Sequence, residues 1–363
     1  MRVGILTLHG AINYGAALQA YGLSRFLTSM GHEVEVIDYF SPEVYSYYDY
    51  HIFSDPTSLR GVISKALRRR RNEREFKAFE AFRMERMTLS HHCVSNEELE
   101  AVCSSYGAVI CGSDQVWNPK ANGGLMREYY LGRVPNGIKR VAYAASFGNV
   151  GVIEGREDEV ATLLRRFDAI SVREDEAVGL CERLSGLPVV RVIDPSMLLS
   201  RADYEKIERP IETPERYLLS YKLGQNDAMT DAVASVSKTL GLPVVSLGRK
   251  MPGSTFRKDI GPSEFLRLYA GADCVITNSF HGTAFSLLYG KPFVTFGNGA
   301  YNSRMETLLG ITGEKTRFCE ESVPTESLCE LLTMCSKRDF GEVIRPERER
   351  ARAFLMSALG GAR

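Results

Sequence analysis

The N-terminal stretch RVGILTLHGAINYGAALQAYGLSRFLTSMGHEVEVIDY, residues 2–39, decides the fold class. Its first seven residues form a nearly continuous apolar run, as in strands that are buried on both faces of a parallel sheet. After a polar turn at 9–16, apolar residues recur with helical spacing until Gly31, where we expect the helix to end. A second strand pattern, EVEVIDY, follows at 33–39. This order predicts a βαβ unit, whose ligands bind where the strands end.

The same rhythm of apolar runs followed by small polar residues returns in two later parts of the chain. One series covers about 107–199 and another begins near 216, with a charged, proline-bearing segment between them. Such segments often join domains, and 363 residues are too many for one typical core. We therefore predict an α/β protein with two Rossmann-like domains. The expected bounds are 1–205 with a helical excursion at about 41–100, 206–335, and a C-terminal helical segment at 336–363 that packs back on the body.

Composition excludes several function classes. The chain has 45 basic and 45 acidic residues, which argues against a nucleic-acid-binding protein that relies on a large positive field. Its eight cysteines form no CxxC pair, so we expect most to be reduced and buried. We find no signal-peptide pattern and no apolar run near the roughly 20 residues that span a bilayer. We expect a cytoplasmic protein, and no dense cluster of carboxylates or histidines predicts a metal site.

A long charged helix is predicted at 59–87, and it contains the basic run Arg68–Arg71. The simpler interpretation is a solvated helix face, which the neighbouring acids Glu73, Glu75 and Glu80 favour. The alternative is a surface that meets anionic lipid or a phosphorylated substrate.

The segment HGAINYGAALQ, residues 9–19, joins the first strand to the first helix. Glycines permit close approach of a ligand to the backbone, and a helix N-terminus favours an anion or a polar group. The segment lacks the GxGxxG pattern of dinucleotide-binding proteins. A tight turn without a ligand explains it equally well. The candidate substrate-binding residues here are Asn13, Tyr14, Gly15 and Gln19.

Two further strand ends carry candidate binding residues. CGSDQVWNP, at 111–119, places the only tryptophan of the chain among polar groups, an arrangement suited to holding a sugar ring. In the alternative, Asp114 is a helix cap and Trp117 fills a domain interface. AASFGN, at 144–149, is a similar strand end. The candidates are Gly112, Ser113, Asp114, Gln115, Trp117, Asn118, Ser146, Phe147 and Gly148.

Arg173 follows the strand pattern FDAISV and could offer its guanidinium fork to a carboxylate or phosphate. The alternative is an ion pair with one of the acids at 174–176, which begin the next helix. Asp194 and Pro195, after another strand, are more typical of a turn or cap than of catalysis.

The segment TNSFHGTAF, at 277–285, reads as the end of a strand, a turn and a helix start. Asn278 and Ser279 can cap that helix, and Gly282 allows close approach. His281 then lies in the first helical turn, where an anion is favoured. In the alternative, it is a buried histidine bonded to a backbone carbonyl. Arg304 follows the next strand and could converge with His281 on one anion; Phe280 completes the candidates of this segment.

Taken together, these segments resemble the polysaccharide pyruvyl transferase family. The resemblance covers about residues 1–315, except the divergent stretch 41–100. It rests on the order and spacing of NYGAALQAYGLSRFL, VICGSDQVWNP, YAASFG, ISVRE, VIDPSMLL and VITNSFHGTAFSLLYGKPFVTF with NSRMETLL. SFHG is the most specific of these elements.

The resemblance implies a fold like that of the two-domain GT-B glycosyltransferases, with the domains facing across a cleft. It implies transfer of a pyruvyl group from phosphoenolpyruvate to two hydroxyls of one sugar, with formation of a cyclic ketal and release of phosphate. The family's catalytic histidine and arginine map onto His281 and Arg173, and its later basic residue, often a lysine, maps onto Arg304. The first domain would bind a sugar or lipid-linked oligosaccharide acceptor, and the second would bind phosphoenolpyruvate, without a further cofactor.

The chemistry requires such residues. The methylene carbon of phosphoenolpyruvate must gain a proton, for which histidine is suited, while arginine suits the carboxylate and phosphate. His281 could instead accept a hydroxyl proton or bind phosphate. A lipid-linked acceptor would give the Arg68–Arg71 helix a peripheral role at the inner membrane face. The alternatives are a GT-B glycosyltransferase that uses a nucleotide sugar, and a non-catalytic binding protein on the same scaffold.

Overall fold

The computed structural model describes residues 1–40, 59–297, 299, 302–334 and 339–360, with only the backbone described for 59–72. The predicted irregular segment at 41–58 and the side chains of Arg68–Arg71 therefore lie outside the described residues. The described chain divides into two compact units. Unit 1 comprises Met1–Leu198 and Glu347–Arg363, and unit 2 comprises Leu199–Pro346.

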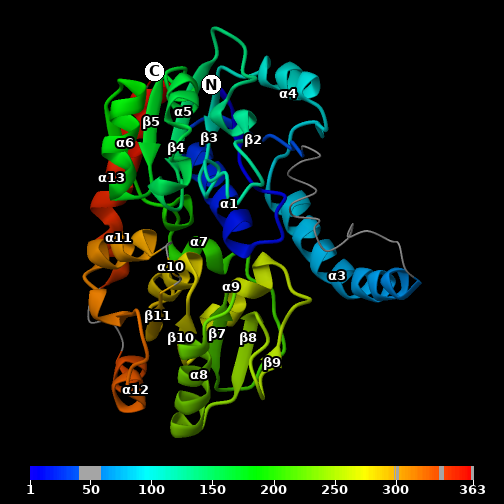
Figure 1. Ribbon diagram of the computed structural model, residues 1–363, viewed down its shortest axis with the longest axis vertical. Coiled ribbons are helices and arrows are strands. Elements are labelled where there is room, and N and C mark those ends of the chain that lie inside the picture. The colour runs from blue at the N-terminus through cyan, green and yellow to red at the C-terminus, as the bar shows by residue number, and fades with distance from the viewer. Residues whose placement is uncertain (41–58, 298, 300–301, 335–338, 361–363) are drawn as a thin grey trace. The chain divides into compact units, whose positions relative to one another are not determined.

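Unit 1 is built on a parallel sheet with the strand order β2-β1-β3-β4-β5-β6 (Figure 1). The strands are β1 (Arg2–Leu6), β2 (Glu33–Val36), β3 (Ala108–Cys111), β4 (Lys139–Ala145), β5 (Ala169–Val172) and β6 (Val189–Arg191). The connecting helices are α1 (Tyr14–Ser29), α3 (Leu59–Arg86), α4 (Asn96–Cys103), α5 (Glu157–Leu164) and α6 (Asp175–Ser185). Short 3₁₀ turns occur at η1 (Arg127–Tyr130), η2 (Val150–Ile153) and η3 (Pro195–Met197).

Unit 2 contains a second parallel sheet with the order β12-β11-β10-β7-β8-β9. Its strands are β7 (Leu218–Lys222), β8 (Val244–Gly248), β9 (Thr255–Phe256), β10 (Cys274–Thr277), β11 (Phe293–Phe296) and β12 (Phe318–Cys319). Its helices are α7 (Arg201–Glu205), α8 (Asp227–Leu240), α9 (Pro262–Gly271), α10 (Phe280–Leu288), α11 (Ser303–Thr312), α12 (Thr325–Thr333) and the 3₁₀ turn η5 (Lys315–Arg317). The two parallel sheets with their helices confirm the predicted α/β class.

The continuous apolar runs form strands because both faces of each sheet are covered. All four residues of β3 and all four of β10 are buried. Full burial of a valine or isoleucine side chain contributes roughly 1.5–3 kcal/mol, so these short runs supply much of the driving force for each sheet.

The last helix, α13 (Phe340–Leu359), packs back on unit 1 through its C-terminal part, as predicted. Glu347 accepts hydrogen bonds of 2.6 and 3.1 Å from Arg191. Arg348 donates to the Met197 carbonyl at 2.8 Å, and Arg352 lies over the ring of Phe26. The domain bounds expected from the sequence give this helix a segment of its own, whereas Glu347–Arg363 belongs to unit 1.

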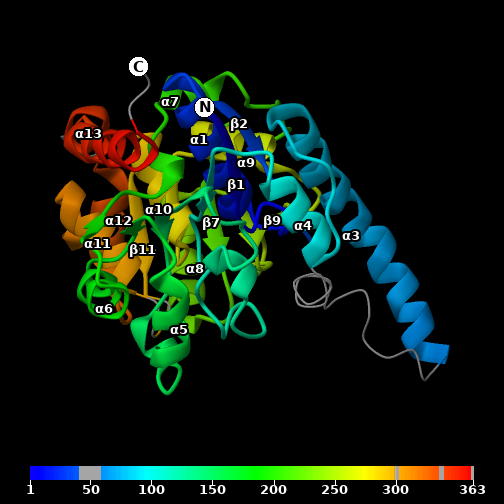
Figure 2. The ribbon, with the colours of Figure 1, turned by 90° about the horizontal axis from the view of Figure 1, so that it is seen from above.

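Helix α3 is the long charged helix that the sequence predicts. In Figures 1 and 2, it extends outward from unit 1, and only its later part lies near the sheet. Tyr14 and Tyr21 of α1 pack there against Phe79 and Phe82, with ring centroids 5.1 and 5.9 Å apart. The C-terminal turns of α3 are thereby fixed beside α1.

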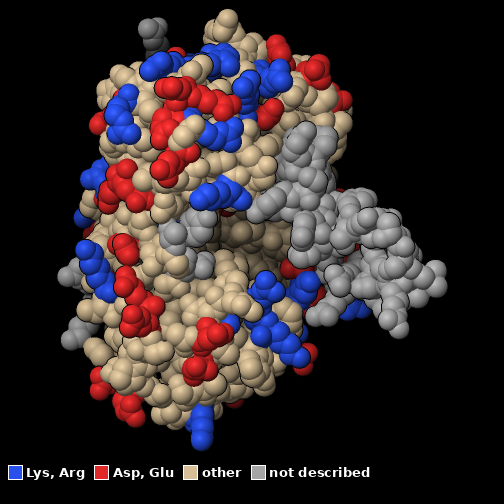
Figure 3. Space-filling view, viewed as in Figure 1, with Lys and Arg blue, Asp and Glu red and all other residues tan. Residues whose placement is uncertain are grey.

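The described cysteines are free thiols, as expected, and most are buried. Burial raises the pKa of Cys93 to about 11 and that of Cys103 to about 12, so both are protonated near neutral pH. Cys335 lies outside the described residues. On the face shown in Figure 3, basic and acidic side chains are interspersed, in keeping with the zero formal net charge.

Candidate functional site

The strand order of unit 2 reverses between β7 and β10, and the chain leaves these neighbouring strands toward different helices. In open parallel sheets, ligands bind beyond the carboxyl ends of the strands at such a reversal. The loops at this edge are Leu223–Asn226, which leads into α8, and Asn278–Ser279, which leads into α10. The segment with the predicted histidine therefore lies where the topology favours a ligand.

Local contacts explain why this segment starts a helix so soon after β10. Ser279 is the N-cap of α10, and its hydroxyl accepts a hydrogen bond from the Gly282 amide at 3.3 Å. A Cβ at position 282 would lie 2.2 Å from Oγ1 of Thr277, so only glycine lets the helix approach the strand this closely. Thr283 anchors the same turn through the Ser279 carbonyl and through Thr295.

Asn278 ties the two loops of this edge together. Its Oδ1 accepts from the Leu223 amide and its Nδ2 donates to the Leu223 carbonyl, both at 2.7 Å. The side chain, predicted to bind substrate, thus uses both ends of its amide on the neighbouring loop. This geometry favours a positioning role for Asn278.

His281 is the second residue of α10 and is buried, next to the positive end of the helix dipole. Its ring meets that of Phe280 edge to face, with centroids 5.1 Å apart. The guanidinium carbon of Arg304, in the first turn of α11, lies 5.9 Å from the centre of the same Phe280 ring. The structure therefore brings two of the three predicted catalytic residues around one aromatic ring within unit 2.

Lys222, which the sequence analysis missed, is the last residue of β7 and only 8% exposed. Its Nζ donates to Oγ1 of Thr230 at 2.5 Å, in the first turn of α8. Among the described residues, no carboxylate forms an ion pair with it. A buried ammonium group beside the positive end of a helix is unfavourable without an anion. The available signal was a lysine that ends the strand run RYLLSYK.

The corresponding reversal in unit 1 lies between β1 and β3, and its side chains bond mainly to one another. Gln19 donates to Oγ1 of Thr7 at 2.8 Å and accepts from the Ser113 amide at 3.0 Å. The Ser113 hydroxyl oxygen lies 2.8 Å from the Ala144 carbonyl and 3.1 Å from Asp194, and its single proton can be donated to either acceptor. Gly112 has φ +108°, and a Cβ there would lie 2.3 Å from the Tyr143 carbonyl oxygen, so the turn requires glycine.

Arg173 lies in unit 1, buried among three carboxylates. Its guanidinium is 2.7 Å from Asp194, 3.3 Å from Glu174 and 3.7 Å from Asp114. Burial alone would lower its pKa, but the three carboxylates outweigh burial and raise it. The Ser146 hydroxyl, another predicted binding group, also bonds to Glu174. This arrangement favours the ion-pairing alternative for Arg173, with Asp194 as a partner that the sequence did not predict.

Trp117 lies in the core of unit 1, at 1% exposure. Its indole stacks on Tyr130 with centroids 5.3 Å apart, contacts Phe147 and Phe167, and donates to the Tyr129 carbonyl at 3.0 Å. No face of the ring is left for a sugar. This position favours a packing role over the predicted sugar contact, and the same holds for buried Phe147.

The remaining candidates of unit 1 hold its loops in place. Asn13 caps α1 by accepting from the amides of Gly15 and Ala16 at 2.9 and 3.2 Å. Asn118 donates to Gln115 at 2.6 Å and accepts from the Lys120 amide at 3.0 Å. Gly148 has φ +74° and donates its amide to Ser146 at 2.9 Å. Whether any of them contacts a substrate stays a prediction.

A second group of titratable residues lies at the ends of β1 and β2 in unit 1. Asp38 bridges two histidines, with Nε2 of His9 at 2.9 Å and Nδ1 of His92 at 2.8 Å. Burial opposes ionisation of Asp38, but its hydrogen bonds and charge interactions with both histidines prevail and lower its pKa. The sequence pattern predicts a turn at His9 but indicates no role for the histidine.

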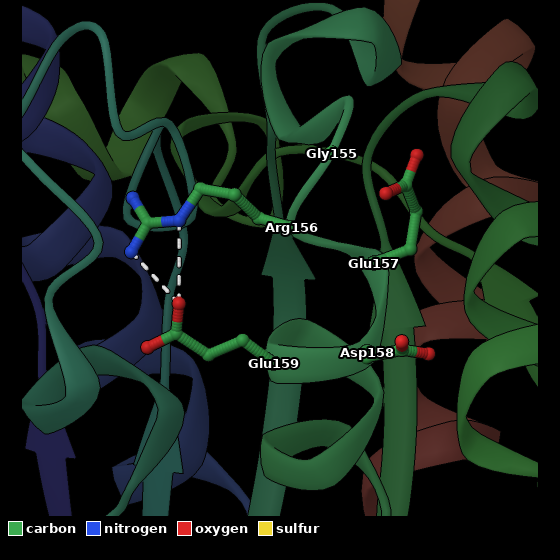
Figure 4. A pocket seen from close by; sticks show the side chains of 5 residues that line it. All are labelled: Gly155, Arg156, Glu157, Asp158 and Glu159. Carbon is green, nitrogen blue, oxygen red and sulfur yellow. Dashed lines mark hydrogen bonds and ion pairs between the residues drawn. The ribbon is translucent and has the colours of Figure 1, made fainter.

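A surface hollow at the start of α5 has a volume of about 560 Å³ (Figure 4). Its lining residues are Gly155, Arg156, Glu157, Asp158 and Glu159, and Arg156 donates to Glu159 at 2.8 and 3.3 Å. The carboxylates leave the hollow negative, so it does not suit a phosphate or carboxylate ligand. None of the predicted site residues lines it.

Among the described residues, no helix is both long and apolar enough to cross a membrane.

Two of the solved structures with a similar fold are a UDP-GlcNAc 2-epimerase and a putative one. The chain is 12% identical to UDP-GlcNAc 2-epimerase from Methanocaldococcus jannaschii, covering 98% of this chain and all of that one, with a TM-score of 0.52. It is 11% identical to a putative UDP-N-acetylglucosamine 2-epimerase from Listeria monocytogenes, covering 100% and 97%, with a TM-score of 0.56. At such identities the likeness shows the fold alone. It defines a two-domain α/β protein of the GT-B-like class.

The sequence identifies the family of the chain, which the fold alone does not. The family model described as polysaccharide pyruvyl transferase matches residues 13–300, so the chain belongs to that family. No curated protein matches the sequence. The match confirms the resemblance found from the motifs and includes the SFHG element.

Proposed function

We propose that this protein transfers a pyruvyl group from phosphoenolpyruvate to two hydroxyls of one sugar in a surface-polysaccharide or glycan precursor. The methylene carbon gains one proton and becomes a methyl group. The central carbon loses the π bond to the methylene carbon and its bond to the phosphate oxygen, and it gains two bonds to sugar oxygens. The two hydroxyls lose their protons, one of which leaves with phosphate. The products are a cyclic ketal and inorganic phosphate, and no further cofactor is needed.

One observation carries the proposal: His281 lies in the first turn of α10, at the strand-order reversal of unit 2, in a chain of the pyruvyl transferase family. Arg304 shares the Phe280 ring with it. A helix N-terminus and two basic side chains at one sheet edge suit a donor with a carboxylate and a phosphate.

In this proposal, His281 delivers the proton to the methylene carbon, because an imidazole can donate and recover a proton near neutral pH. Arg304 and Lys222 hold the two anionic groups of phosphoenolpyruvate. The first sugar hydroxyl adds to the central carbon once its positive charge develops, and the second displaces phosphate.

Arg173 acts in the proposal as a positioning residue, since its guanidinium already bonds to three carboxylates. It would hold Asp194, and through Asp194 the Ser113 hydroxyl, in place at the edge of unit 1. We propose that this unit binds the acceptor, a free or lipid-linked sugar, and that the enzyme acts in the cytoplasm. Its proposed peripheral contact with the inner membrane face through Arg68–Arg71 concerns side chains outside the described residues.

The test uses the purified protein with phosphoenolpyruvate and a panel of sugar acceptors, and measures phosphate release and ketal formation. We expect both with a suitable acceptor. In His281→Gln, we expect turnover to fall by at least 100-fold while calorimetric binding of phosphoenolpyruvate persists, since a general acid typically contributes that much. His91→Gln, at an exposed histidine of unit 1, is the matched control.

Other outcomes identify the alternatives. Loss of phosphoenolpyruvate binding in His281→Gln would make His281 an anion contact instead of the acid. Unchanged turnover would remove it from the mechanism. Tight binding of UDP without any response to phosphoenolpyruvate would favour the nucleotide-sugar glycosyltransferase, and binding without turnover of either would favour a binding protein.

A further inference from the structure

Arg83, in the last turn of α3, is a buried cation without an anionic partner among the described residues. It is 8% exposed, and its Nη1 is fully buried without a hydrogen-bond acceptor. Its guanidinium carbon lies 5.3 Å from the centre of the Phe40 ring. The helix C-terminus and the ring both favour a positive charge, but neither accepts the five N–H groups of a guanidinium. Burying such donors without acceptors is costly, so the arrangement indicates that a ligand or water supplies the missing acceptors.

Two histidines surround the same ring. The Phe40 ring centroid lies 5.3 Å from that of His9 and 5.5 Å from that of His92. Gly10 fixes the ring, because a Cβ at position 10 would lie 1.9 Å from it. Arg83, His9 and His92 are therefore held around Phe40 by residues that follow β1 and β2.

The one carboxylate of this cluster, defined as Arg83, Phe40, His9, His92 and Asp38, faces the two histidines and forms no ion pair with Arg83. His9 faces the Thr7 carbonyl with Nδ1 at 3.2 Å and Asp38 with Nε2 at 2.9 Å. The single carboxylate of Asp38 is thus engaged by the two histidines, and the charge of Arg83 is left over. The N–H donors of the guanidinium therefore suit an anion from outside the described residues.

We propose that the Arg83 cluster binds an acidic group of a sugar, the carboxylate of a uronic acid or the phosphate of a sugar phosphate. The planar guanidinium can offer two parallel N–H groups to such an anion, and half-exposed His92 can add a third donor. That the anion belongs to a sugar rests on the proposed function. The cluster lies beside the β1–β3 reversal of unit 1, the proposed acceptor side, and it would make an acidic sugar the preferred acceptor.

The test measures binding to the purified full-length protein by calorimetry, without phosphoenolpyruvate. The probes are methyl β-D-glucuronide, glucose 1-phosphate, inorganic phosphate and, as the neutral reference, methyl β-D-glucoside. We expect at least one acidic sugar to bind ten-fold or more tighter than the glucoside. Arg83→Met should reduce the affinity for the acidic sugar to that for the glucoside, and Arg83→Lys should retain part of the preference. Arg74→Gln, at an exposed arginine of the same helix, should change nothing.

Thermal unfolding separates a ligand contact from a structural role. Because Arg83 has no hydrogen-bond acceptor among the described residues, Arg83→Met should keep or raise the melting temperature of the ligand-free protein. The acidic sugar should raise the melting temperature of the wild type but not that of the Arg83→Met variant. A lower melting temperature of Arg83→Met in the absence of ligand would assign Arg83 to the fold and overturn the proposal.

The choice of probe identifies the anion. Preference for the glucuronide assigns a carboxylate, and preference for glucose 1-phosphate assigns a phosphate. Equal binding of all three sugars, preference that survives in Arg83→Met, or binding of inorganic phosphate alone would overturn an acidic-sugar site. These measurements do not involve pyruvyl transfer, so failure of the proposed reaction would be seen separately, in the phosphate-release assay.

Discussion

Arg173 and Lys222 are both buried cations at the carboxyl edge of a parallel sheet, but their surroundings differ. Arg173 of unit 1 has three carboxylates within 3.7 Å, whereas Lys222 of unit 2 bonds to the Thr230 hydroxyl. A buried charge that the protein itself neutralises serves mainly to fix neighbouring groups. We propose that a buried charge left without a carboxylate among the described residues, such as that of Lys222, receives an anion from outside. The two edges therefore differ: unit 1 neutralises Arg173 with its own carboxylates, whereas we propose that Lys222 of unit 2 meets an anionic group of the donor.

The strongest way to break this comparison is to remove Arg173. In Arg173→Met, the carboxylates of Asp194 and Glu174 lose their counter-charge in a buried position. We expect the free energy of unfolding to fall by about 3–5 kcal/mol, as when one partner of a buried ion pair is deleted. Urea denaturation measures this loss of unfolding free energy, and Arg183→Met on α6 is the control. A loss below about 1 kcal/mol, within the range of surface pairs, would show that the cluster is not structural.

Removing Lys222 should have the opposite signature. Lys222→Met is expected to leave the melting temperature unchanged or higher, while affinity for phosphoenolpyruvate falls about 30-fold, or roughly 2 kcal/mol, the typical value of a hydrogen bond to a charged group. Lys238→Met, at an exposed lysine of the neighbouring helix α8, is the matched control for calorimetry. Destabilisation without any change in affinity would place Lys222 with Arg173, as a structural cation.

Gly282 tests whether the geometry of the α10 start matters as much as its charge. In Gly282→Ala, the new Cβ meets Thr277 at 2.2 Å and must push α10 away from β10. Overpacking of this kind costs about 1–3 kcal/mol, and turnover should fall as well, because His281 is the preceding residue. Gly179→Ala on α6 is the control, since open space surrounds that position. Equal stability and turnover in both variants would show that the close approach is dispensable.

Acid titration tests the role of Asp38 in unit 1, and its expected effect in free energy is the smallest of the four. The pKa of Asp38 is lowered in the folded protein from its ordinary value of 3.8. Its ionised form therefore contributes stability that is fully present above pH 3.8 and is lost as the pH falls through the lower, folded value. The difference in unfolding free energy between wild type and Asp38→Asn should be about 1 kcal/mol at neutral pH. This difference should shrink only when the pH falls below 3.8. A difference independent of pH would contradict the bridging role of Asp38.

Much of the fold follows from local pattern, because continuous apolar runs and glycine-containing turns are legible one segment at a time. The segment VITNSFHGTAF indicated a strand, a cap and a helix start, and each is present. Charge partners are not legible in this way. Glu174 adjoins Arg173 in sequence, but Asp194 reaches it only because β5 and β6 pair in the sheet.

Trp117 shows the same limit for packing. Its polar neighbours in sequence suggested a ligand contact, but Tyr130, Phe147 and Phe167, from three other segments, enclose it. Lys222 and Arg83 were missed because a lysine or arginine at the end of an element is usually solvated. Only the folded chain reveals how deeply these two are buried.

The paired hydrogen bonds between Asn278 and Leu223 bear on the heat of binding. They couple the loops after β7 and β10, so neither loop must be ordered separately when a ligand arrives. Fixing a free residue costs about 1–2 kcal/mol of conformational entropy, and here that loss has already occurred during folding. Association at this edge should therefore carry a small entropic penalty, and its strength should come chiefly from the enthalpy of the charged contacts.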